Sequence, residues 1–255
     1  MTRRVKQIVY STFYLIVLIC FVSAFYFVFI KPAPTCFDNV QNQNEEGIDC
    51  GGPCARFCLP HDLKPIDVVD RIYKFEPDSA HLSLLARISN PNLGYAAKNF
   101  SYSFLLYDDK GVLVQSFSGN SFIYAGEVKY IAVPNVAAPL TSFSRIDFKL
   151  ENPKWVPALE FGSQPQIALR GTEARISNNN SLATEGQIVN NDTLLFPSVK
   201  IVVVFKGQLG QLTGVSETEI NNLAPNESRP FSVVHPPITN VDISGTKIFA
   251  YALRP

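Results

Sequence analysis

The pattern of hydrophobic and polar positions divides the chain into one long apolar run and a series of short alternating segments. The run covers Ile8–Ile30, twenty-three residues without a charged side chain. A helix rises about 1.5 Å per residue and the hydrocarbon core of a bilayer is about 30 Å thick, so about 20 apolar residues are enough to cross it. We therefore expect a single transmembrane helix at residues 8–30, preceded by a stub at residues 1–7.

From about residue 64 the apolar positions recur at every second residue. Phe100, Tyr102, Phe104 and Leu106 alternate with small or polar neighbours, and the chain then runs through Asp-Asp-Lys-Gly at residues 108–111. This pattern is typical of a β-hairpin with one apolar face. Further strands are expected at residues 66–75, 81–89, 112–117, 127–133 and 144–150. Short strands at this spacing predict a β-sandwich at residues 64–157.

The second half of the chain repeats the first at an offset of about 100 residues. The matching segments, in order, are 187–191 with 87–91, 199–205 with 100–106, and 224–227 with 125–127. Similarity that recurs strand by strand indicates a tandem repeat of one fold, so we expect a second β-sandwich at residues 158–255. The proline-rich join at residues 151–165 should interrupt any strand. Trp155 lies in this join and is expected to pack between the two domains.

Composition agrees with a mainly β chain. The sequence holds 19 Phe and 10 Tyr against one Met, and aromatic residues favour strands. The predicted fold class is therefore mainly β, with one N-terminal transmembrane helix, a small disulfide-rich neck at residues 31–63, and two tandem immunoglobulin-like β-sandwich domains.

Charge sets the expected orientation of the helix. Arg3, Arg4 and Lys6 precede the apolar run, and Lys31 alone follows it closely. Basic flanks stay in the cytoplasm, which predicts a cytoplasmic N-terminus, an extracytoplasmic bulk and a location in the cell membrane. The chain after residue 7 carries 19 basic and 22 acidic residues, and no basic patch is interleaved with aromatic residues. Nucleic acid is therefore not an expected partner.

A cleaved signal peptide is the alternative interpretation of the same run. Val22–Ala24 offers the small residues of a cleavage site. Six further apolar residues, Phe25–Ile30, follow that site, so cleavage there would leave an apolar new terminus on a secreted form.

Four cysteines lie within twenty-three residues of the neck, at Cys36, Cys50, Cys54 and Cys58. Dense, even-numbered cysteines in an oxidising compartment indicate two disulfides, with three pairings open. A segment this short cannot bury a sufficient apolar core, so the crosslinks have to replace one.

The neck also concentrates oxygen-bearing side chains at Asp38, Asn42, Glu45 and Asp49. Oxygen ligands of this kind suit a hard cation, so these four residues are a candidate Ca²⁺ site, and Ca²⁺ is the cofactor that the sequence favours. The alternative is that the polar side chains cap turns while the disulfides hold the shape. Zinc is a third alternative, although the spacing between Cys54 and Cys58 is longer than that of a zinc knuckle.

Two stretches carry family resemblances. Residues 36–58 resemble the C-x-D-G-x-x-N-x-x-E-x-x-x-D-C-G-G-x-C-x-x-C segment of bacterial surface and secreted proteins, with Asn39 in place of Gly and one extra residue before Cys58. Phe104–Asp108 matches the F-x-L-Y-D signature of a bacterial immunoglobulin-like domain family. Residues 86–91 and 125–127 also resemble that family. The resemblance implies an accessory extracytoplasmic module, with core side chains at Phe104 and Leu106 and a turn fixed by Tyr107 and Asp108.

The sequence carries no recognisable catalytic motif. His61, His81 and His235 are far apart, and His61 and His235 adjoin prolines, which predicts exposed loop positions. We therefore expect no enzyme, and a structural or interaction role at the cell surface or envelope, with a protein or cell-envelope partner. The alternative is an accessory subunit of a larger membrane complex, whose helix assembles with other helices.

Overall fold

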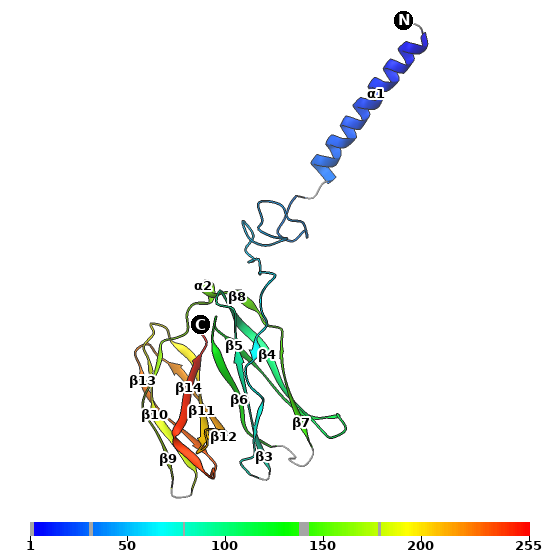
Figure 1. Cartoon of the computed structure of the whole chain (residues 1–255). Helices are drawn as coiled ribbons and strands as arrows, with labels where there is room; N and C mark the ends of the chain where they lie inside the picture. The colour runs from blue at the N-terminus through cyan, green and yellow to red at the C-terminus, as the bar shows by residue number, and fades with distance from the viewer. Residues whose placement is uncertain (1–2, 31–32, 79, 138–142, 178–179) are drawn as a thin grey trace. The chain divides into compact units, whose positions relative to one another are not determined.

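The structure is a computed structural model that describes residues 3–30, 33–78, 80–137, 143–177 and 180–255 (Figure 1). Lys31 and Pro32, at the start of the predicted neck, lie outside the described residues. The chain divides into two compact units, Met1–Cys58 and Leu59–Pro255.

The first unit begins with α1, Arg3–Phe25, which continues as a short π-helical segment, η1, at Tyr26–Ile30. No residue of α1 is buried against the rest of the described chain. By length and composition this helix can cross a membrane, and a signal sequence near the N-terminus passes the same test. After η1 the described part of the unit consists of turns held by two disulfides, with one isolated β-bridge between Gly47 and Cys50.

The second unit consists of β-strands and one helical turn. The elements of its first half are β1 (Asp67–Val68), β2 (Tyr73–Phe75), β3 (His81–Ser89), β4 (Tyr95–Tyr107), β5 (Leu113–Ile123), β6 (Val128–Ala137), β7 (Arg145–Glu151), β8 (Trp155–Pro157) and α2 (Ala158–Phe161). The elements of its second half are β9 (Ile167–Ile176), β10 (Leu182–Asn190), β11 (Phe196–Gly207), β12 (Leu212–Leu223), β13 (Ser228–His235) and β14 (Val241–Ala252).

These strands form two β-sandwiches of antiparallel sheets. In the first, β3 pairs with β1, β2 and β6, and the opposite sheet has the order β5-β4-β7 with β8 on β4. In the second, the sheets are β13-β10-β9 and β12-β11-β14. The predicted fold class is confirmed: a mainly β chain with one N-terminal apolar helix, two disulfides and β-sandwich domains.

Each sandwich has its own core, which the alternating pattern of its strands supplies. In the first, Phe100, Phe104 and Leu106 of β4 are fully buried against β3. In the second, Ile201, Val203 and Phe205 of β11 pack against β10 and β13. Burial of a large apolar side chain stabilises the fold by about 1.5–3 kcal/mol.

The sequence repeat corresponds to a repeated hydrogen-bond network. Asn90 and Asn190 are both buried at the ends of β3 and β10, and their amide groups donate to the carbonyl oxygens of Tyr124 and Ala224, respectively. Glu127 accepts from the Tyr124 backbone N–H, as Glu227 does from that of Ala224, each over 2.8 Å. A buried amide and a carboxylate thus close the same loop in both sandwiches, although Glu227 is more exposed than Glu127.

The turn after β4 is fixed by Asp108. Its Oδ1 accepts hydrogen bonds from the backbone N–H groups of Lys110 and Val112, at 2.9 and 2.8 Å. Gly111 has φ +79°, a conformation that glycine adopts without steric cost. The aspartate of the F-x-L-Y-D stretch therefore has a local role in shaping this turn.

A third cluster joins the two sandwiches. Phe75, Leu85 and Ala132 from the first pack with residues of the second, which are Val202, Val204, Val215 and Tyr251. The outer face of the β3 sheet is thus covered by the outer face of the β12-β11-β14 sheet, which makes four successive sheet layers (Figure 1). Strands β3 and β11 are consequently buried on both faces over residues 82–86 and 201–205.

Two expectations about the join were wrong. Trp155 does not pack between the sandwiches: it lies in β8, which pairs with β4, and its side chain packs against the first core. Prolines also do not interrupt every strand there, since Pro157 itself ends β8, opposite Tyr95. An edge position tolerates proline because no partner strand needs its missing N–H.

Candidate functional site

The disulfide-bonded segment pairs Cys36 with Cys54 and Cys50 with Cys58. The Cα atoms of the two pairs are 5.6 and 5.0 Å apart. The second glycine of the D-C-G-G stretch, Gly52, is required for steric reasons. Its φ is +57°, and a Cβ atom there would lie 2.2 Å from the carbonyl oxygen of Asn44. Only glycine therefore allows the chain to pass this close to its neighbour.

The four candidate calcium ligands lie in this segment, and their side chains are engaged by the backbone. Asp49 accepts from the N–H groups of Asp38 and Asn39, at 3.0 Å from each. Asp38 accepts from the N–H groups of Thr35 and Val40 and from the Asn42 amide. The bond from Thr35 is the largest of the effects that lower the pKa of Asp38. These carboxylates cap turns, as the alternative interpretation expects.

Glu45 is the most buried of the four, at 6% exposure. Its Oε2 accepts from the backbone N–H groups of Asn42 and Asp49, both at 3.2 Å. Its Oε1 lies 3.0 Å from Sγ of Cys54, which as a disulfide sulfur has no proton to donate. Cys36, Glu45 and Cys54 come within 4.8 Å of one another, but both sulfurs belong to the same disulfide and cannot act as thiolate ligands.

Backbone N–H groups around a carboxylate present positive dipoles, which oppose a cation at the same oxygens. Ca²⁺ takes six to eight oxygen ligands, so it would have to displace several of these bonds. Within the described neck, the Oδ1 atom of Asn42 is buried without a hydrogen-bond partner. The geometry favours the capping role, and calcium binding stays a prediction.

Calcium dependence is therefore a direct test of the neck. If the carboxylates only cap turns, we expect the protein to have the same melting temperature in a saturating excess of Ca²⁺ as in excess chelator, because a ligand stabilises only the protein that binds it. Differential scanning calorimetry of the full chain in detergent measures this. If calcium raised the melting temperature of the unchanged protein but not that of Asp49→Asn, the calcium site would be established.

Two tyrosine hydroxyls bridge the sandwiches. Tyr124 of the first donates to the carbonyl oxygen of Ala252 and accepts from the N–H of Arg254, at 3.1 and 3.0 Å. Tyr251 of the second accepts from the N–H of Tyr130 at 3.1 Å. Burial raises the pKa of Tyr124 to about 12 and also raises the pKa of Tyr251. The contact between the sandwiches is thus both apolar and hydrogen-bonded.

These raised pKa values predict alkaline loss of stability. The unfolded chain ionises its tyrosines near pH 10, whereas Tyr124 in the folded chain stays protonated to about pH 12, so rising pH favours unfolding across this window. We expect the melting temperature to fall less steeply between pH 10 and 12 in Tyr124→Phe than in the unchanged protein. Tyr251 and the lysines contribute equally to the pH dependence of the melting temperature in both proteins, so the comparison isolates the effect of Tyr124. If the melting temperature fell equally steeply with pH in both proteins, this would contradict the raised pKa assigned to Tyr124.

The same junction buries a lysine. Lys129 is 4% exposed, and its Nζ donates to the carbonyl oxygen of Phe122 at 3.0 Å and lies 3.4 Å from the centroid of the Phe122 ring. Burial lowers the pKa of Lys129, and it also raises the pKa of its neighbour Glu127. The carbonyl and ring contacts favour the ammonium form and so oppose the effect of burial.

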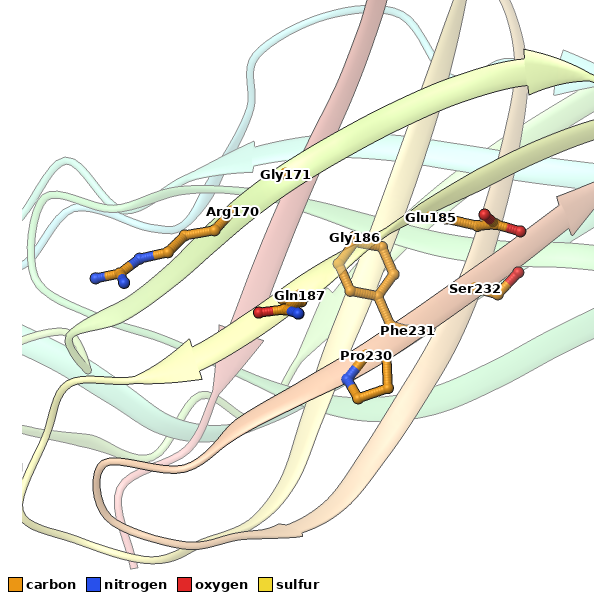
Figure 2. A pocket seen from close by; sticks show the side chains of 8 residues that line it. All are labelled: Arg170, Gly171, Glu185, Gly186, Gln187, Pro230, Phe231 and Ser232. Carbon is orange, nitrogen blue, oxygen red and sulfur yellow. The ribbon is translucent and has the colours of Figure 1, made fainter.

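A wide hollow of the second unit lies on the outer sheet β13-β10-β9 (Figure 2). It measures about 770 Å³ and is open to solvent. Gly171 and Gly186 leave its floor without side chains, and the ring of Phe231 lies beside Gly186. Its polar side chains are Arg170, Glu185, Gln187 and Ser232. Glu185 is already paired with Arg175, at 2.8 Å. The hollow is a depression produced by missing side chains. Ser232 lies opposite Glu185 on the neighbouring strand, but no hydrogen bond joins their side chains.

A second cavity, of about 460 Å³, lies between the two sandwiches. It is lined from the first by Asp70, Arg71, Tyr73, Arg87, Val128 and Tyr130, and from the second by Val204, Lys206, Gly210, Gln211, Leu212, Lys247 and Phe249. We refer to it as the inter-sandwich groove. No sequence motif predicted it, because its two walls come from strands of different sandwiches that lie far apart in the sequence.

One histidine prediction was wrong. His235 is not an exposed loop residue: it ends β13 and is 2% exposed, with its ring 5.0 Å from that of Phe205. Burial lowers its pKa. The apolar spacing of β13 continues to this residue, so the period-two pattern was a better guide than the prolines that follow. His81 contacts Asp78 at the surface, and His61 is exposed.

No protein-family model and no curated protein matches the chain. Among solved structures, the transglutaminase of red sea bream aligns with 72% of this chain at 9% identity and a TM-score of 0.22. The 11S allergen of Cocos nucifera aligns with 77% of it at 8% identity and a TM-score of 0.12. The aligned region spans 31% of the transglutaminase chain and 91% of the allergen chain. Likeness at these TM-scores carries no argument about this chain.

Proposed function

We propose that the protein is a single-pass membrane protein that displays its four-layer sheet unit on the extracytoplasmic side as a non-enzymatic interaction module. The observation that carries the proposal is α1, an apolar helix of 23 residues that is buried against nothing in the described chain. A helix of this kind in a soluble protein would expose its apolar surface to water, whereas a bilayer accommodates it.

The neck supports the extracytoplasmic placement. Phe37, Ile48 and Phe57 are 88%, 60% and 53% exposed, so the segment has little apolar core and depends on its two disulfides. Disulfides persist in oxidising compartments and are rare in the cytosol. Arg3, Arg4 and Lys6 at the other end of the helix favour a cytoplasmic N-terminus.

The buried ionisable groups support a binding role over catalysis. Glu127 holds the backbone of Tyr124, and Lys129 holds that of Phe122. His235 lies under Phe205, with Nδ1 2.7 Å from the carbonyl oxygen of Pro236. Each of these groups contacts the protein's own backbone or core. The surfaces that remain are the broad faces and loops of the sandwiches, which is where β-sandwich modules bind partners.

An alkaline carbonate wash of membranes, followed by mass spectrometry of the retained chain, tests whether α1 is an anchor or a cleaved signal peptide. The proposal predicts that the protein stays in the membrane with Arg3–Phe25 intact. A soluble chain that begins near Phe25 would instead show cleavage after Ala24 and remove the anchor from the account. Release as an intact chain would show that α1 does not insert.

A further inference from the structure

The inter-sandwich groove concentrates positive charge on a unit that has almost none overall. Residues 59–255 hold 17 Lys and Arg and 18 Asp and Glu, a net charge of −1. The lining of the groove holds four basic residues, Arg71, Arg87, Lys206 and Lys247, and one acidic residue, Asp70. Like charges gathered in one concavity repel each other and focus their field on it, so their arrangement favours an anion there.

Internal partners neutralise only part of this charge. Asp70 accepts from Arg87 at 3.1 Å, and both side chains are more than a third exposed. Asp242, outside the lining, lies opposite Lys206 on the neighbouring strand. The hydrogen bond from Ser244 lowers the pKa of Asp242 most, and Lys206 adds to the effect. No ion pair of Arg71 or Lys247 occurs among the described residues. At least two cations of the groove are therefore free to meet a ligand.

Aromatic faces line the same space. The rings of Tyr130 and Phe249, one from each sandwich, are 5.0 Å apart. The guanidinium of Arg71 lies 5.2 Å from the centroid of the Tyr73 ring, and that of Arg87 lies 6.0 Å from that of Tyr130. Stacking on a ring holds a guanidinium flat while its N–H donors remain available for carboxylate or phosphate oxygens. The groove thus offers both charged donors and flat apolar surfaces.

We propose that the inter-sandwich groove binds an acidic saccharide, a sugar that carries a carboxylate or a phosphate group. The acidic group pairs with Lys247 and the arginines, while the apolar face of the sugar ring packs on the aromatic side chains. A volume of about 460 Å³ lies within the range of small-molecule sites. This inference rests on the proposed function, because it names the class of ligand that the displayed unit would meet outside the cell.

The groove exists only while the two sandwiches stay in contact. Its walls are Tyr73, Arg87 and Tyr130 on one side and Lys206, Lys247 and Phe249 on the other, and the apolar cluster around Val204 holds these walls together. A single sandwich would present half of the site.

Isothermal titration calorimetry of the full chain in detergent micelles tests the proposal. The result does not depend on how the protein is oriented in a cell. The probes are trigalacturonate for the carboxylate, glucose 6-phosphate for the phosphate, and maltotriose as the neutral sugar. We expect at least one acidic probe to bind and maltotriose not to bind. Lys247→Glu should weaken the binding about tenfold or more, since it replaces a charged donor with a like charge.

Two further variants make the test specific. Lys110→Glu makes the same charge change at the exposed turn after β4 and should leave the Kd unchanged. Asp70→Asn removes the internal partner of Arg87 and should tighten binding, which damage to the fold would not do. Failure of both acidic probes to bind would overturn the proposal. Binding of maltotriose as tight as that of the acidic probes would also overturn it, as would an equal loss of affinity in Lys110→Glu. Inorganic phosphate serves as a fourth probe, and binding as tight as that of glucose 6-phosphate would likewise overturn the proposal.

Discussion

Replacing Asn190 with alanine is expected to destabilise the second sandwich by about 3 kcal/mol, because buried polar groups left without a partner cost about 1–3 kcal/mol each. The Asn190 amide donates to the carbonyl oxygens of Leu194, Leu223 and Ala224, at 2.8, 3.2 and 3.0 Å. Its Oδ1 accepts from the Asp192 N–H at 2.9 Å. Alanine satisfies none of these groups. Chemical denaturation of the full chain in detergent, followed by fluorescence, measures the loss.

The matched control is the next residue. Asn191 is exposed, so Asn191→Ala should change the free energy of unfolding by less than about 0.5 kcal/mol. Asn90→Ala should have an effect of the same order as Asn190→Ala, because Asn90 makes the corresponding bonds to Tyr95 and Tyr124. Equal and small effects of Asn190→Ala and Asn191→Ala would contradict the role assigned to the buried amides.

Removal of the Cys36–Cys54 disulfide is expected to unfold the neck. The only apolar side chain buried among the described neck residues is Cys54 itself, so the crosslinks take the place of a core. Loss of a disulfide from a small domain costs about 2–5 kcal/mol, more than so small a segment can spare. In Cys36→Ala/Cys54→Ala we expect amide hydrogens at residues 42–54 to lose their protection from exchange, measured by mass spectrometry.

Residues 59–255 should keep their protection in that variant, because they form a compact unit separate from the one that holds both disulfides. This provides an internal control for general misfolding. Cys20→Ala is the second control, since Cys20 is the one free cysteine among the described residues and its loss removes no crosslink. A neck that stays protected without the disulfide would show that its polar turns fold unaided.

The sequence predicted the elements whose signal is local. Alternation at Phe100–Leu106 indicated a half-buried strand, and the offset of about 100 residues indicated a second sandwich, which the matching bonds of Asn90 and Asn190 now explain. A contact between the domains was expected at Trp155, which was wrong, and the contact between the β3 and β11 sheets was missed. A signal for it exists in Ile201–Phe205, a run without alternation, because a continuous apolar run is typical of a strand that is buried on both faces.

The candidate sites were harder to predict because they depend on contacts between distant residues. Asp38 and Asp49 were recognised as an oxygen-rich group, but only their N–H partners distinguish turn capping from cation binding. Disulfide pairing was open for the same reason. The groove joins Arg87 to Lys247, 160 positions apart, and neither residue stands in a motif.

We propose above that the sheet unit stands outside the cell on an uncleaved anchor. The most direct measurement is protease digestion of intact cells that carry an epitope tag before Arg3. We expect added protease to remove Leu59–Pro255 while the tag stays protected and attached to α1. The tag should become accessible only after the cells are opened. A sheet unit that resists the protease until the cells are opened, or a tag already lost from the chain before any digestion, would contradict it.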